Sequence, residues 1–122
     1  MTEKHPTIRL HLWLETDDGV FFGAGRAQLL EGIETHGSLK KAAEHLGMSY
    51  RAAWGKIKAT EENIGAKLVI QNGGKKGGYN LTSEGRRLMR QYRTWFFGVE
   101  EYARHLANGV FSFNAKQFKK RP

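Results

Sequence analysis

Cysteine is absent from this chain of 122 residues. Its absence excludes disulfide bonds, zinc sites with cysteine ligands and thiol catalysis, and it fits a reducing cytoplasm. No apolar run approaches the roughly 20 residues that a membrane-spanning helix needs. The first residues, MTEKHP, lack the apolar core of a signal peptide. We therefore expect a cytoplasmic protein that makes no use of a membrane.

Motifs for catalysis, metals and nucleotides are missing too. The five histidines do not pair at metal-binding spacing on one helical face. The acidic pairs at 17–18, 61–62 and 100–101 fit a turn and two solvated helix faces. Two glycine-rich stretches match the motifs of nucleotide-binding loops only in part. One has Gln28 in place of its third glycine, and the other has Tyr79 and Asn80 where lysine and serine or threonine are required. We predict no enzyme activity, no metal site and no cofactor.

Positive charge is plentiful and concentrated. The net charge is +8, and residues 38–93 account for all of it with twelve Lys/Arg against four Glu. A basic patch of this kind attracts polyanions by releasing their counterions. Charge alone leaves two alternatives open, a nucleic-acid-binding protein and a generically basic soluble protein.

The hydrophobic pattern predicts an α+β fold, mainly α. Strict alternation over Thr7–Thr16 indicates a strand, and Asp18-Gly19 suits the turn of a hairpin that returns through residues 20–22. Helices follow over about 26–36, from Ser38, and from Ser49 to Gly65. The third of these would face inward with Ala53, Ile57, Thr60 and Ile64. The expectation is one domain, a winged helix-turn-helix with its helix-turn-helix at about 38–64, wing at about 67–81, long helix at about 82–108 and a loose basic tail at 109–122.

The segment from Ser38 to Lys58 has helix-turn-helix chemistry. Alanines at 42, 43 and 53 allow two helices to cross closely, and Gly47 permits the turn between them. The N-terminus of the second helix would enter the major groove of DNA, where arginine can donate two hydrogen bonds to guanine. The candidate DNA-binding residues in and before this helix are Ser38, Lys40, Ser49, Tyr50, Arg51, Trp54 and Lys58, with Arg26 on the preceding helix as a phosphate contact.

Alternatives remain for these residues. Arg51 and Lys58 could contact only phosphate, or only water. Ser38 could be a helix cap alone, or a cap that also binds phosphate. Trp54 could contact DNA or pack against the protein, and packing is favoured because tryptophan is rarely left exposed.

Double glycines flank Lys75 and Lys76 and predict the tip of a hairpin. In a winged helix such a tip carries its lysines to phosphate or into the minor groove. The alternative is a mobile basic loop that contacts no partner.

The last predicted helix carries a heptad pattern. A helix so long and apolar is hard to bury within one chain of this size. The pattern therefore favours a homodimer over the alternative, in which the helix packs only against the core of its own chain. Two recognition helices would then lie about 34 Å apart, one turn of duplex DNA. The predicted dimerisation residues are Leu88, Tyr92, Trp95, Val99, Tyr102 and Leu106.

These strings resemble a known family. GSLKKAAEHLGMSYRAAW, followed by the double-glycine wing and LTSEGRRL, closely resembles the N-terminal DNA-binding domain of molybdate-responsive regulators of the ModE type, and more distantly the LysR-type regulators. The match covers residues 8–106. It implies a winged helix-turn-helix that binds operator DNA in bacteria or archaea and dimerises through the long helix and the N-terminal strand region.

The chain departs from this family in two places. It ends about fourteen residues after the long helix, which leaves no room for the molybdate-binding β-barrels, so molybdate is not expected as a ligand. The trigger could then be absent, a different effector, or a separate effector-sensing protein. The wing also departs, because Tyr79 and Asn80 replace a further glycine-rich stretch.

Two functions follow from these observations. The first is a sequence-specific, dimeric transcriptional regulator that binds double-stranded DNA. The second is a winged-helix module that docks a protein partner and has no DNA specificity of its own.

Overall fold

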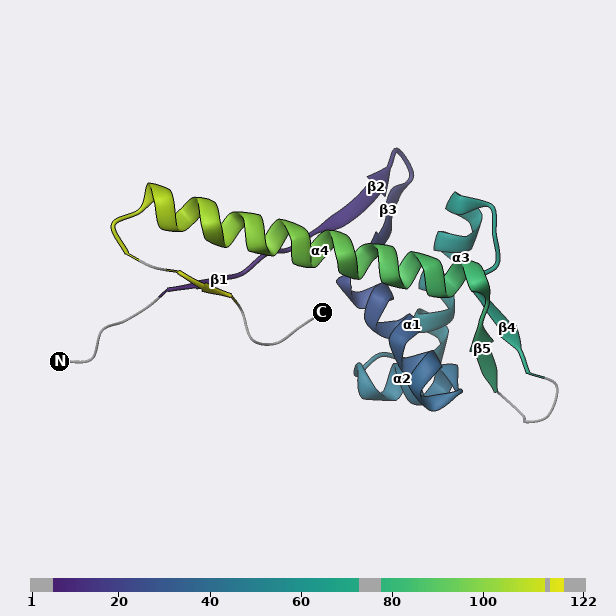
Figure 1. Ribbon diagram of the computed structural model, residues 1–122. Coiled ribbons are helices and arrows are strands. Elements are labelled where there is room, and N and C mark those ends of the chain that lie inside the picture. The colour runs from purple at the N-terminus through teal and green to yellow at the C-terminus, as the bar shows by residue number, and fades with distance from the viewer. Residues whose placement is uncertain (1–5, 73–77, 114, 118–122) are drawn as a thin grey trace.

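In a computed structural model (Figure 1), the described residues form four helices and three two-stranded sheets. The structure describes residues 6–72, 78–113 and 115–117. The elements in chain order are β1 (Thr7–Ile8), β2 (Trp13–Thr16), β3 (Gly19–Gly23), α1 (Ala24–His36), α2 (Leu39–His45), α3 (Tyr50–Ile64), β4 (Val69–Gln71), β5 (Tyr79–Leu81), α4 (Ser83–Val110) and β6 (Lys116–Gln117). The expected fold, a mainly helical winged helix-turn-helix, is confirmed.

The helix ends follow local signals in the sequence. Ser38, Ser49 and Thr82 each accept a hydrogen bond from a backbone N–H of the first turn, as N-caps do. Gly37 and Gly65 end α1 and α3 with φ of 65° and 69°, in the left-handed region that glycine tolerates. These five boundaries agree with the sequence prediction.

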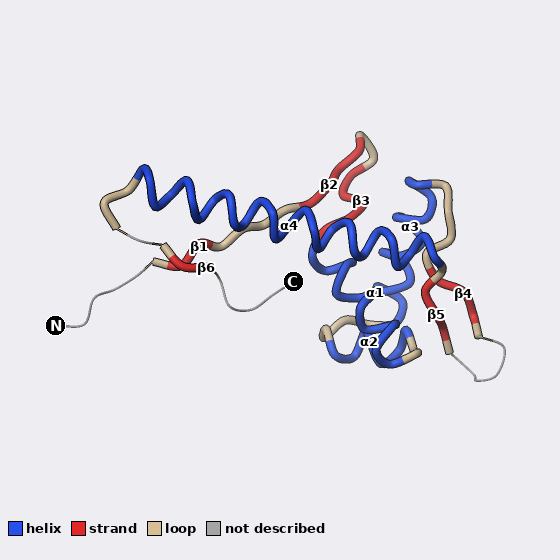
Figure 2. The backbone as a smooth tube through the Cα atoms, viewed as in Figure 1, coloured by secondary structure: helices blue, strands red, loops and turns tan. Residues whose placement is uncertain are grey.

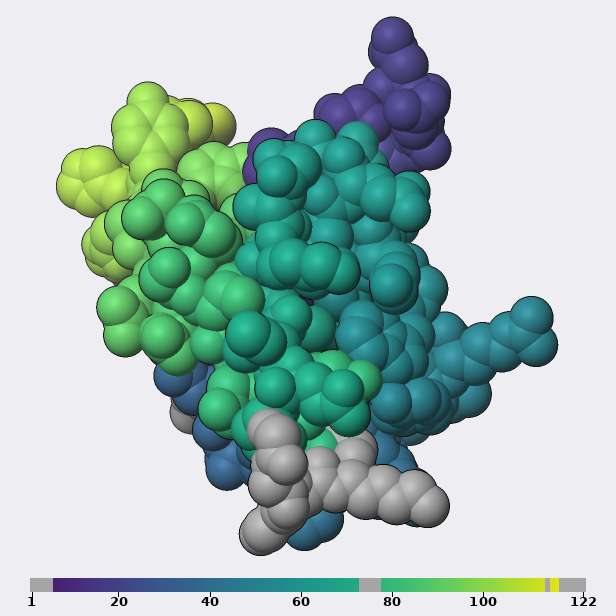
Figure 3. Space-filling view, turned by 90° about the vertical axis from the view of Figure 1, so that its right-hand side faces the viewer, coloured from purple at the N-terminus to yellow at the C-terminus, as the bar shows by residue number. Residues whose placement is uncertain are grey.

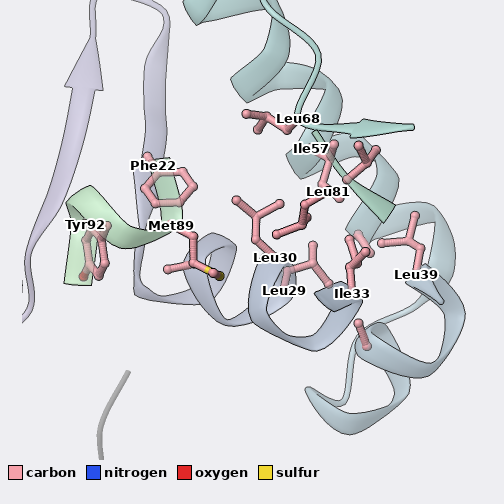
Figure 4. Close-up of a cluster of buried hydrophobic side chains, with 14 of the residues drawn as sticks. Phe22, Leu29, Leu30, Ile33, Leu39, Ile57, Leu68, Leu81, Met89 and Tyr92 are labelled. Atoms are coloured by element: carbon pink, nitrogen blue, oxygen red, sulfur yellow. The ribbon is translucent and has the colours of Figure 1, made fainter. Parts of the chain in front are cut away.

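The core lies where α1, α3, the wing strands and α4 meet. Leu30, Ile57 and Leu81 point toward one another from α1, α3 and β5 (Figure 4), and each is at most 4% exposed. At the other end of the core, Phe22 of β3 meets Tyr92 of α4 edge to face, with ring centroids 5.6 Å apart. One apolar cluster therefore joins the hairpin, the helix-turn-helix and α4.

The N-terminal strand is shorter than predicted. Residues 9–12 form no strand. Instead β1 pairs in parallel with β6, and β2 pairs with β3 in an antiparallel hairpin that projects from the body (Figure 2). Leu10 and Leu12 still pack against the core, whereas Leu14 is exposed. The alternating pattern correctly predicted a hairpin. It could not show that the predicted first strand is interrupted at residues 9–12, where the chain crosses α4.

The tail after α4 is not loose throughout, which corrects the sequence prediction. Ala115 is buried, and its N–H donates to the side-chain oxygen of Asn108 at 2.8 Å. Lys116 then pairs with Thr7, and its N–H donates to the Pro6 carbonyl. Residues 116 and 117 are ordered there as β6 because β1 provides a partner strand.

Three expectations about burial were wrong. Ile64, expected to face inward, is 37% exposed, while Glu61 and Glu100, expected on solvated faces, are 8% and 2% exposed. Glu61 turns inward because the chain after α3 doubles back and presents backbone N–H groups to its carboxylate. The helical period alone does not reveal such a loop.

Candidate nucleic-acid interface

α3 presents its N-terminal turn at the surface. The Ser49 hydroxyl accepts the N–H of Ala52 at 3.0 Å, which starts the helix at Tyr50. Tyr50 is 41% exposed, Arg51 and Lys58 are exposed, and Ala53 and Ile57 on the opposite face are buried. In Figure 3 the surface of α3, in teal, lies below the tip of the β2–β3 hairpin. The predicted recognition helix therefore has the required inner and outer faces.

α2, which leads into α3, packs very closely against α1. A Cβ at Gly32 of α1 would lie 2.7 Å from the Cβ of Ala42, so only glycine fits where these helices cross. The turn into α3 passes through Gly47, whose φ is 69°. Small residues at both places set the angle at which α3 leaves the body.

The N-terminus of α2 lies beside the wing. Ser38 caps α2 by accepting the N–H of Lys41 at 3.2 Å, and it forms a bridge with Gly78 at the start of β5. Lys40 is exposed in the first turn. Thus Ser38 serves as the cap that the sequence predicted, and Lys40 is free of the core.

Trp54 is half-buried and packs against the apolar core. Its ring meets that of Tyr79 edge to face, with centroids 5.2 Å apart and planes at 83°. The ammonium group of Lys58 lies 5.4 Å from the centroid of the Trp54 ring. Between the two alternatives for Trp54, the geometry favours packing.

Tyr79 is the interface residue that the sequence reasoning missed. It begins β5, and its ring packs edge to face against that of Trp54 on α3. Burial raises the pKa of Tyr79 above its usual value, and the contact with Tyr50 raises it further. The available signal was that Tyr79 stands where a glycine-rich stretch is usual in similar sequences.

Arg26 lies on the first turn of α1, half-buried. Its guanidinium donates to the Val20 carbonyl at 2.6 Å, and burial lowers its pKa from the ordinary value. It lines an open groove of about 570 Å³ together with Lys56 of α3, a basic residue that the sequence reasoning also passed over. To bind phosphate as predicted, the Arg26 guanidinium would therefore have to do so while it also donates a hydrogen bond to a backbone carbonyl.

The wing lysines, Lys75 and Lys76, lie outside the described residues. The strands below them are described: β4 and β5 pair in register, with Val69 opposite Leu81 and Gln71 opposite Tyr79. A wing therefore exists at the predicted place, next to α2 and α3.

The heptad residues of α4 do not share one exposed face. Tyr92 is 4% exposed and donates its hydroxyl hydrogen to the Leu12 carbonyl at 2.9 Å, so it belongs to the core of its own chain. Leu88 and Val99 are half-buried. Trp95, Tyr102 and Leu106 are 37%, 68% and 52% exposed.

Other sites are absent from the part of the chain that the structure describes. Within residues 6–72, 78–113 and 115–117, no group of three or more His, Asp or Glu side chains could hold a metal ion. Among the helices of those residues, none is both long and apolar enough to span a membrane.

Comparison with known proteins identifies a family and a fold. Residues 26–86 match the family described as bacterial regulatory helix-turn-helix protein, lysR family. The matched segment runs from the first turn of α1 through the wing to the first turn of α4, and so contains every element of the interface described above.

Two curated relatives each align with about two thirds of this chain. The molybdenum transport protein ModE of Azotobacter vinelandii is 39% identical over 82 residues, which are 66% of this chain and 30% of that protein. The transcriptional regulator ModE of Haemophilus influenzae is 32% identical over 83 residues, 66% of this chain and 32% of that protein. The chain spans about a third of the length of the curated relatives it matches.

A solved structure supports the fold. The DNA-binding domain of CbnR, solved in complex with DNA, superimposes with a TM-score of 0.57 at 16% identity and covers 70% of this chain and 95% of that one. At this level of identity the likeness shows a shared backbone arrangement.

Proposed function

Because this chain belongs to the lysR family of bacterial regulatory helix-turn-helix proteins, we propose that it is a ModE-type transcriptional regulator that binds specific sequences in double-stranded DNA. The observation that carries the proposal is the exposed N-terminal turn of α3. Tyr50 and Arg51 stand at the surface there, while Ala53 and Ile57 anchor the helix from behind. The N-terminal turn of a recognition helix is the part that reaches base edges.

The neighbouring elements supply the contacts that hold DNA. Lys40, at the start of α2, and Lys58, further along α3, are exposed cations on either side of the recognition turn. Cations there would fix the register of the duplex by binding phosphate. Lys75 and Lys76, which the sequence assigns to the wing, would add positive charge for binding phosphate.

Two copies of the chain would pair through α4. Its C-terminal half extends beyond the body formed by α1–α3 (Figure 1) and exposes large apolar side chains. The exposed residues there are Tyr102, Leu106 and Val110, and Phe111 and Phe113 follow directly after the helix. A partner that covered them would remove apolar surface from water and place a second recognition helix on the DNA.

The role also locates the protein. A regulator of transcription acts on the chromosome, so we place this chain in the bacterial cytoplasm and assign it no enzymatic reaction. One of its relatives is named a transcriptional regulator and another a molybdenum transport protein.

Selection of bound sequences from a random duplex pool tests the proposal. The pool should converge on a pseudo-palindrome, and the logarithm of the binding constant should fall with the logarithm of salt by roughly 0.9 per phosphate neutralised. Absence of binding to any duplex at low ionic strength would contradict the proposal and favour a protein-docking module.

Sedimentation equilibrium tests the pairing. The unmodified chain, of 13.9 kDa, should sediment with twice that mass. Leu106→Glu places a charge in the exposed apolar surface and should give the single-chain mass, whereas Gln91→Ala, nearer the start of α4, should not. A single-chain mass for the unmodified protein at micromolar concentration would rule out the dimer.

A further inference from the structure

The open groove beside the β2–β3 hairpin has the size of a ligand site. Its volume is about 570 Å³, within the range of about 300–1,000 Å³ that small-molecule sites usually have. Gln28 of α1, Lys56 of α3 and Phe96 of α4 all line it. A molecule held there would therefore contact three helices of the fold together with the hairpin.

Much of the lining is apolar. Leu10 and Leu12 are half-buried and pack against the core, and Phe96 behind them is 5% exposed. The hairpin adds Trp13 and Val20, which are 52% and 43% exposed. Apolar side chains gathered around a hollow leave apolar surface in water, and the apolar part of a ligand would cover it.

The charged side chains of the lining are basic. Arg26 of α1 is half-buried, and its hydrogen bond to the Val20 carbonyl uses one N–H of the guanidinium and leaves others that can donate. Lys56 of α3 is exposed. Among the described residues that line the groove, none is Asp or Glu. Because burial takes water away from Arg26, an anion bound beside it would replace the lost solvation.

The first turn of α1 adds backbone donors on the same side. Ala24 and Gly25 line the groove, and the N-cap residue, Gly23, has no side chain that could accept a hydrogen bond from the first turn. The N-terminus of a helix carries a partial positive charge and favours an anion. This feature reinforces the two cations, which stand on two different helices.

The groove lies on a different side of α3 from the recognition surface. Arg51 and Lys56 are five residues apart, which separates them by about 140° around a helix of 3.6 residues per turn. Lys56 can therefore serve the groove while Arg51 faces DNA.

We propose that this groove binds a small organic acid, whose carboxylate is held by Arg26 and Lys56 and whose apolar body lies against Leu10, Leu12 and Phe96. Arginine can hold a carboxylate through two parallel hydrogen bonds. An inorganic anion would leave the apolar lining uncovered, and a neutral hydrocarbon would leave the cations unpaired. The chemistry of the lining therefore favours a ligand that carries both parts.

Calorimetric titration with octanoate, octan-1-ol and acetate tests the proposal. Two variants change the groove. Lys56→Gln removes one cation, and Gly25→Leu fills the groove from α1, where an added Cβ would meet no atom within 4 Å. The matched controls are Lys41→Gln on the exposed side of α2 and Gly98→Leu, at an equally open glycine of α4. Thermal unfolding checks that each variant is folded.

Octanoate should bind at one site per chain. Octan-1-ol lacks the charge and acetate lacks the apolar body, so both should bind at least about ten-fold more weakly. Lys56→Gln should weaken octanoate binding by about ten-fold, the effect of one charge-assisted hydrogen bond. Gly25→Leu should abolish binding, and the two controls should bind as the unmodified chain does.

Four results would overturn the proposal. Equal affinities for octanoate and octan-1-ol would show that the cations hold no carboxylate. Unchanged binding by Gly25→Leu would place octanoate elsewhere on the protein. Binding by Leu106→Glu but not by the unmodified chain would show that a second copy covers the groove. Absence of heat with octanoate would exclude the ligand, and weaker duplex binding by Lys56→Gln would then assign the groove to DNA.

Discussion

The carboxylate of Glu61 accepts the backbone N–H of Leu68 at 2.8 Å, across the loop that joins α3 to the first wing strand. The same oxygen lies 3.5 Å from the N–H of Val69, and Lys67 Nζ lies 4.0 Å from the other carboxylate oxygen. A residue of the recognition helix thus completes the hydrogen bonds at the point where the chain enters the wing. The side chain is 8% exposed overall, so water cannot readily replace it.

Glu61→Ala should lower the free energy of unfolding by about 1–3 kcal/mol, because it leaves buried backbone donors without an acceptor. Glu61→Gln retains a carbonyl oxygen and should lose less. Denaturant unfolding measures both, with exposed Glu62→Ala as the control, expected within about 0.5 kcal/mol of the unmodified chain. Equal stabilities for Glu61→Ala and Glu62→Ala would show that the bond contributes nothing.

Arg51→Ala should weaken binding to the cognate duplex by about 1–3 kcal/mol and relax the preference at one base position. Lys40→Ala, by contrast, should weaken binding to all duplexes alike and reduce the salt slope by about one, as loss of a phosphate contact does. Selection from a random pool and salt titration distinguish the two. An unchanged base preference for Arg51→Ala would remove that residue from sequence reading.

Gly85 and Gly98 both lie in α4 and should respond oppositely to alanine. A Cβ at Gly85 would lie 2.2 Å from the Leu68 carbonyl oxygen, so Gly85→Ala must push the wing strand away from α4 and should destabilise the fold. No atom lies within 4 Å of a Cβ at Gly98, and alanine there should stabilise the helix by up to about 1 kcal/mol. Thermal unfolding of the two variants measures the contrast, and a stable Gly85→Ala would contradict the close approach.

Tyr92→Phe should cost about 1 kcal/mol at neutral pH, since it removes the hydrogen bond to the Leu12 carbonyl. Burial raises the pKa of Tyr92 in the folded chain above its usual value. The stability from this group is therefore present below about pH 10, where an unfolded tyrosine ionises, and is lost as pH rises through the folded-state pKa. Unfolding measured from about pH 8 to about pH 11 should show a shallower alkaline decline for Tyr92→Phe. Parallel curves would contradict this linkage.

Tyr92 also shows where a heptad pattern misleads. Its spacing from Leu88 and Trp95 is that of a dimer seam, yet its ring fills the core of its own chain and meets Phe22, 70 residues away in sequence. Periodicity reports which residues share a helix face. It cannot distinguish a face covered by the chain itself from a face left for a partner.

The sequence by itself determined the helices, five of their boundaries and the exposed N-terminal turn of α3. Serine and threonine caps and glycine stops act within one turn of backbone, so Ser38, Ser49, Gly65 and Thr82 specify boundaries without help from distant residues. The exposed face of α3 also followed from helical period alone.

Only the tertiary structure decided which side chains meet across the fold. Tyr79 packs on Trp54 from 25 residues away, Glu61 turns inward to accept backbone N–H groups before the wing strand, and β6 pairs with β1. Such contacts depend on the path of the loops between elements, and that path cannot be inferred from a hydrophobic pattern. For this reason the exposed face of α3 could be predicted, and the packing of Tyr79 on Trp54 could not.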